Sequence, residues 1–100
     1  MQLRLADRTK REFDEAFAFY GAEDEELGRT FRGLTQKLLI EIAEHPSRWR
    51  LISKRVRRCL YPRPFPYVIF YQVRTDHVLV TSIMHTSRHP DSWKRRAPKK

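Results

Sequence analysis

Cysteine and long apolar runs are both scarce in this chain. Cys59 is the single cysteine among 100 residues, which excludes an internal disulfide and a cysteine-based zinc cluster. No stretch approaches the roughly 18 continuous apolar residues that a membrane-spanning helix needs, and residues 1–7 lack the apolar segment of a signal peptide. We therefore expect a cytoplasmic protein without a metal site or a cofactor.

Acidic residues are scarce in the second half of the chain. Lys and Arg number 21 against 12 for Asp and Glu, which gives a formal net charge of +9. Ten of the twelve acidic residues lie in the first 44 positions, and only Asp76 and Asp91 follow them. A polybasic second half indicates a partner rich in negative charge, such as nucleic acid, an anionic membrane or an acidic protein.

The apolar content is sufficient for one small core. Hydrophobic residues make up 40% of the chain, and 12% are aromatic. A chain of this length forms one domain, which is too small to enclose a deep cofactor cavity beside its core. We predict a single domain over residues 1–93 with its working site in a surface groove, followed by a basic, disordered tail over residues 94–100.

The first half of the chain predicts a strand and a helix. Polar and apolar residues alternate over residues 2–6, as in a short strand. Asp7 is expected to cap the following helix through its carboxylate. Apolar residues from 13 to 20 recur at helical spacing, and Gly21 is expected to end this helix.

A second helix follows directly. It is expected to open at Asp24, with acidic residues in its first turn, where negative charge suits the helix dipole. Apolar residues recur every three or four positions from Leu27 to Ile42. The helix should end at His45, because a residue that precedes proline is disfavoured in the helical region. The two helices are therefore predicted to form a hairpin.

The second half predicts three strands. Residues 51–61 mix β-compatible with basic side chains, and residues 65–73 are almost entirely aromatic or β-branched. Residues 74–76 form a tight turn into a further apolar strand over residues 77–85. The predicted fold is α+β, in the order β-α-α-β-β-β, with the helical hairpin packed on one face of a mainly antiparallel four-stranded sheet.

Strand alternation predicts which side chains contact the helices. Tyr67, Ile69, Tyr71 and Val73 share one face by period two, and we expect them to pack on the helices. Three intervening residues are then expected on the open face: Val68, Phe70 and Gln72. Arg57 and Arg58 must point to opposite faces, so only one of them can easily join a groove.

Three motifs follow one another in the second half. They are an arginine-rich strand, an FPYxIxY-like strand and an HxxRxPxxW ending, carried by Arg57-Arg58-Cys59-Leu60, residues 65–71, and His85, Arg88, Pro90 and Trp93. In this order they resemble toxins of the RelE/ParE superfamily, also described as plasmid stabilisation proteins, over nearly the whole chain. The resemblance implies a cytoplasmic toxin of a type II toxin–antitoxin system, neutralised by a small acidic antitoxin.

The first functional hypothesis is mRNA cleavage on the ribosome, as the RelE branch implies. A metal-independent endoribonuclease needs a base, an acid and cations around the phosphorane. The catalytic candidates are His85, Arg88 and Arg58. The substrate-binding candidates are Arg57, Arg63, Trp93 and Lys94. A structural role is the alternative for His85, as a hydrogen-bonding group at a strand end, and for Trp93, as an anchor for the tail.

Two further hypotheses stay open. The ParE branch resembles this fold and poisons DNA gyrase by protein contact, without chemistry. RelE-type nucleases carry an arginine directly after the strand tyrosine and a lysine-rich strand before it, whereas Val68 follows Tyr67 here and the preceding strand offers arginines. The third hypothesis is a basic nucleic-acid-binding module that uses phosphate contacts and aromatic stacking.

Overall fold

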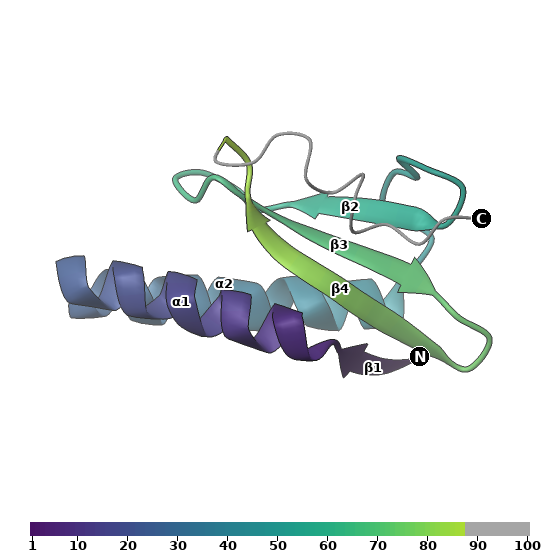
Figure 1. Cartoon of the computed structure of the whole chain (residues 1–100), viewed down its shortest axis with the longest axis horizontal. Helices are drawn as coiled ribbons and strands as arrows, with labels where there is room; N and C mark the ends of the chain where they lie inside the picture. The colour runs from purple at the N-terminus through teal and green to yellow at the C-terminus, as the bar shows by residue number, and fades with distance from the viewer. Residues whose placement is uncertain (88–100) are drawn as a thin grey trace.

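A computed structural model of the chain describes residues 1–87. Two helices lie side by side along one face of a sheet (Figure 1). The α+β fold and its β-α-α-β-β-β order are thereby confirmed. The elements are β1 (Gln2–Leu5), α1 (Asp7–Glu23), α2 (Glu25–Glu44), β2 (Val56–Leu60), β3 (Tyr67–Val73) and β4 (His77–His85).

The four strands lie in the order β1-β4-β3-β2. The pairs β2–β3 and β3–β4 are antiparallel, whereas β1 runs parallel to β4. The register between β3 and β4 shifts once, because Phe70 lies opposite Ser82 while Tyr71 lies opposite Val80. Thr81 is therefore an extra residue in β4. Such a bulge reverses the alternation of side chains along the strand that carries it.

The helix α1 begins and ends at residues other than those predicted. Its N-cap is Ala6, which makes no side-chain cap, so the prediction that Asp7 caps it is wrong. Asp7 is instead the first helical residue, where its charge suits the helix dipole. Gly21 lies within the helix, close to Gly28 of α2: a Cβ added to Gly28 would lie 2.9 Å from the Gly21 Cα atom. Here glycine permits two helices to approach closely and does not end one of them.

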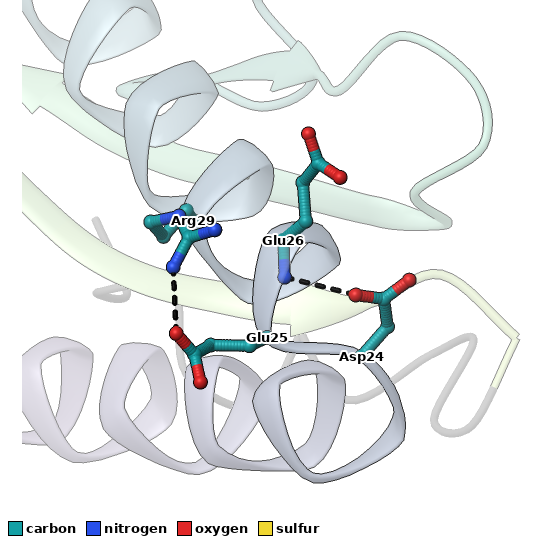
Figure 2. A network of polar contacts seen from close by, with 4 residues as sticks. All are labelled: Asp24, Glu25, Glu26 and Arg29. Atoms are coloured by element: carbon teal, nitrogen blue, oxygen red, sulfur yellow. Dashed lines mark hydrogen bonds and ion pairs between the residues drawn. The ribbon is translucent and has the colours of Figure 1, made fainter.

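The start of α2 is held by local polar contacts, as Figure 2 shows. The carboxylate of Asp24 accepts a hydrogen bond from the Glu26 backbone N–H at 2.9 Å, so Asp24 is the N-cap of this helix. Arg29 pairs with Glu25 at 2.8 Å, one turn apart on the exposed side. At the other end the helix stops at Glu44, and His45 is the C-cap. Both predicted limits of this helix are therefore confirmed.

The main core lies between the helices and the sheet, and aromatic rings dominate it. Phe31 of α2 is fully buried, and its ring lies within 5.2–5.8 Å of the rings of five neighbours. These are Phe13, Tyr20, Tyr61, Phe65 and Tyr67. Tyr67, Ile69 and Tyr71 belong to this core as predicted. Val73 does not, because it is the last residue of β3, beside the exposed turn, and is 41% exposed.

The other face of the sheet carries a second, smaller apolar cluster. Val68 and Phe70 pack there with Val56 and Met84, and Ile52 lies against them. Gln72 is buried as well. Val68, Phe70 and Gln72 point away from the helices, as predicted. The prediction that this face is open is wrong there, since all three side chains are buried.

The first turns of α1 close the free edge of β4. β1 pairs with β4 only as far as Val80. Beyond that point the Arg8 side chain donates to the Thr81 carbonyl at 3.3 Å. The Glu12 carboxylate accepts a hydrogen bond from the Ile83 backbone N–H at 3.0 Å. These side chains replace a missing neighbouring strand, which would otherwise leave pairing groups available to another chain.

Candidate functional site

His85 lies at the end of β4 on the helix side of the sheet. It is opposite Tyr67 in the register, and the two rings make an edge-to-face contact with centroids 5.2 Å apart. The Nδ1 atom of His85 accepts a hydrogen bond from the Ser87 backbone N–H at 3.2 Å, and the Ser87 hydroxyl lies at the same distance. The imidazole therefore connects the turn after β4 to the aromatic core.

Arg58 lies on the other face of the sheet. It is opposite Phe70 in the register between β2 and β3. Directly paired residues share a face, and faces alternate along a strand, so Arg58 and Phe70 point away from the face of Tyr67 and His85. The strands β2 and β4 lie on either side of β3, so they are separated by two strand spacings, each of about 4.8 Å. The structure does not bring His85 and Arg58 into one site.

Arg57 lies on the helix side, opposite Tyr71. Its Nη1 atom donates hydrogen bonds to the backbone carbonyls of Trp49 at 2.6 Å and Ser47 at 3.3 Å. The Tyr71 hydroxyl donates to the Pro46 carbonyl at 2.7 Å. Two neighbouring side chains thus anchor the segment that leaves α2. The role of Arg57 in this structure is to hold that segment, which leaves only part of its guanidinium for a ligand.

Arg63 lies exposed in the loop between β2 and β3. That loop is tied to the turn after β4, because the Thr86 N–H donates to the Pro66 carbonyl at 2.8 Å. Arg63 and His85 are therefore carried by segments that meet at the same end of the sheet. Three further candidates lie outside the described residues: Arg88, Trp93 and Lys94.

At the opposite end of the sheet, the predicted candidate Arg57 lies in a group of cations whose other three members sequence reasoning missed. Here the start of β2 meets the end of β3 around a pocket of about 360 Å³. Four cationic side chains line it: Lys54, Arg55, Arg57 and Arg74. The antiparallel pairing of β2 with β3 could have indicated this group from the sequence. It brings residue 56 opposite residue 72, so the basic residues that flank these two positions lie close together.

The buried groups with perturbed pKa values belong to the core. Burial raises the pKa of the Cys59 thiol to about 12, helped by the nearby Glu41 carboxylate. Burial also raises the pKa of the Tyr61 hydroxyl, which lies 2.7 Å from the Thr35 hydroxyl. Both groups therefore stay protonated at neutral pH. Neither is suited to act as a nucleophile or as a general base.

Within residues 1–87 no three His, Cys, Asp or Glu side chains gather as they would around a metal ion. Neither α1 nor α2 combines the length and the apolar character that a membrane crossing requires.

The chain is similar to a known protein family and to solved structures. A family model described as the ParE toxin of a type II toxin–antitoxin system, parDE, matches residues 3–90. Among solved structures, the chain is similar to one from the chromosomal ParDE toxin–antitoxin system of P. aeruginosa, with a TM-score of 0.72 at 13% identity over 85% of this chain and 95% of that chain. At that identity the likeness shows the fold alone. No curated protein sequence matches the chain.

Proposed function

Because the chain belongs to the ParE toxin family of type II toxin–antitoxin systems, we propose that it arrests growth by binding a target protein, DNA gyrase. In this proposal the chain does not cleave mRNA. The observation that carries it is the placement of the two described catalytic candidates, since His85 and Arg58 point to opposite faces of the sheet. Two residues that act together in one cleavage step must both lie within hydrogen-bond distance of the same reacting group.

The bonding of the candidate side chains supports the same conclusion. His85 Nδ1 already accepts a hydrogen bond from Ser87, and Arg57 donates to two loop carbonyls. An arginine side chain stays protonated at neutral pH and cannot replace a missing base. The strand tyrosine Tyr67 is followed by Val68, where the resemblance to RelE-type nucleases would require an arginine.

An antitoxin is the partner that the family implies. We propose a small acidic protein, attracted by the net charge of +9. The outer strand β2 offers it an apolar and a cationic contact: Leu60 is 53% exposed, and Arg58 lies two residues before it on the same face. In this proposal the antitoxin neutralises the toxin in the cytoplasm by covering this strand.

The test uses the purified full chain in two assays run on the same sample. One measures DNA supercoiling by gyrase, and the other measures cell-free translation together with the integrity of the message. We expect supercoiling to be blocked while the mRNA stays intact. A sample mixed with the acidic protein encoded by the adjacent gene is the control, and it should recover supercoiling. Cleaved mRNA with normal supercoiling would overturn the proposal and restore the nuclease hypothesis.

A further inference from the structure

The basic pocket at the end of β3 is built from two segments, residues 51–57 and residues 72–75. Lys54 and Arg55 precede β2, Arg57 lies within it, and Arg74 follows β3. Its volume of about 360 Å³ lies within the range of roughly 300–1,000 Å³ that small-molecule sites occupy. The antiparallel pairing of β2 with β3 fixes the positions of both segments relative to each other, so the fold itself forms the pocket.

The charge in the pocket is uncompensated. Its lining contains no Asp or Glu among the described residues. None of its four cations forms an ion pair within residues 1–87. The Arg57 guanidinium is oriented by its bonds to Trp49 and Ser47, so it is held in place before any ligand arrives. Four like charges around one cavity favour an anionic ligand with more than one charge.

A buried hydrogen-bond donor gives a second, independent indication of a ligand. Gln72 lines the pocket although it is only 2% exposed. Its Nε2 atom is buried and has no hydrogen-bond partner within residues 1–87. Buried polar groups in native proteins are nearly always paired, so such an atom calls for an explanation. An acceptor oxygen from a bound ligand would satisfy it, and Thr75 lines the same pocket.

We propose that this pocket binds a ligand of nucleotide size that carries several phosphates. The arginine forks suit phosphate oxygens, and the Gln72 amide donates to a further oxygen. Leu51 and Val73 line the pocket as well, and both are partly exposed, so they offer apolar contact to a sugar or a base. Phosphates of this kind come either from a free nucleoside triphosphate or from consecutive positions of a nucleic-acid strand. The inference does not depend on the proposed gyrase target, because it rests on the pocket lining and the buried Gln72 donor alone.

The experiment is a calorimetric titration of the full chain at low ionic strength. The probes are ATP, a short single-stranded DNA and inorganic phosphate. We expect ATP or the DNA strand to bind more tightly than inorganic phosphate, since each adds phosphates and an apolar group. Binding of ATP alone identifies a free nucleotide as the source, and binding of the strand alone identifies nucleic acid. Either result supports the site.

Matched variants locate the binding. Arg74→Gln removes one pocket cation and should weaken the affinity about tenfold, as expected for a charged hydrogen bond. Lys37→Gln removes the same charge from the exposed side of α2 and should change the affinity less than about twofold. Equal losses in the two variants would show that net charge alone attracts the probe, and would overturn the proposal.

Gln72→Leu tests the buried donor. The leucine keeps most of the volume but offers no N–H group, so the affinity should fall at least about threefold while the melting temperature does not drop. In the wild type, the side-chain amide signals of Gln72 in an NMR spectrum should shift as ATP or DNA is added. Unchanged amide signals at saturation, or no binding of either probe at about 1 mM, would contradict the site.

Discussion

The two ends of the sheet differ in how their polar groups are satisfied. At the end where β4 finishes, His85 packs against Tyr67 and accepts a hydrogen bond from Ser87. At the end where β3 finishes, cationic side chains surround a pocket, and the Gln72 Nε2 atom is buried without a partner in the described chain. The first end is completed by the protein itself, whereas the second has donors and charge left for a ligand.

This difference indicates that the end at His85 contributes to the stability of the fold, whereas the pocket end contributes to recognition of a ligand. A site for a ligand keeps polar groups whose partners arrive with the ligand, while a structural site pairs them internally. The catalytic candidate His85 lies at the internally paired end. The polar residues that line the pocket at the other end are arginine, lysine, glutamine and threonine, which can bind an anion but offer no base near neutral pH.

The largest expected effect is at the aromatic end. Phe31→Ala removes a fully buried ring that contacts five others, and it should lower the free energy of unfolding by about 3–5 kcal/mol. Phe19→Ala is the control, because Phe19 is 56% exposed, and it should cost less than about 1 kcal/mol. Urea denaturation followed by circular dichroism measures both. Similar losses in the two variants would mean that the ring cluster is not the centre of the core.

A smaller effect is expected at the pocket end. Arg57→Ala removes the hydrogen bonds to the Trp49 and Ser47 carbonyls and should cost about 1–2 kcal/mol. Amide hydrogen exchange should quicken in residues 46–50 before it changes elsewhere. Arg55→Ala, two positions away and exposed, should leave both stability and exchange unchanged. Unaltered exchange in Arg57→Ala would show that Arg57 does not anchor this segment.

Alkaline pH should lower the free energy of unfolding, because two buried side chains of the sheet have raised pKa values. Burial raises the pKa of Cys59 from 9.0 to about 12. It raises the pKa of Tyr71 from 10.0 to about 12, although the Arg57 guanidinium opposes the shift. Groups with raised folded-state pKa values contribute stability that is complete below their unfolded pKa and is lost as the pH rises toward 12. Urea midpoints should thus fall from about pH 9 upward, and less steeply in Cys59→Ala than in wild type. A flat profile to pH 11 would contradict these raised values.

The order of the elements could be predicted from the sequence because side-chain periodicity is a local property. The helical spacing from Leu27 to Ile42 and the proline after His45 were enough to place α2. The two ends of α1 could not be predicted correctly: Asp7 does not cap the helix, and Gly21 does not end it. Whether a carboxylate caps, or a glycine ends a helix or admits a neighbouring one, depends on contacts that the local sequence does not contain.

The candidate site could not be predicted because one residue changes the alternation of β4. Val78 and Val80 face the helices, but the bulge at Thr81 reverses the phase, so Ile83 rather than Ser82 faces them next. Simple alternation from Val78 would place His85 on the same face as Arg58. The bulge moves His85 to the helix side, and no motif in the sequence marks it.

The most direct test of this account is the toxicity of His85→Phe. Phenylalanine keeps a ring against Tyr67 but has no nitrogen to accept or transfer a proton. Growth arrest after induction would be compared with that of the wild type, with circular dichroism to verify folding of the variant. The account predicts that His85→Phe arrests growth as the wild type does. A folded His85→Phe protein that no longer arrests growth would contradict it.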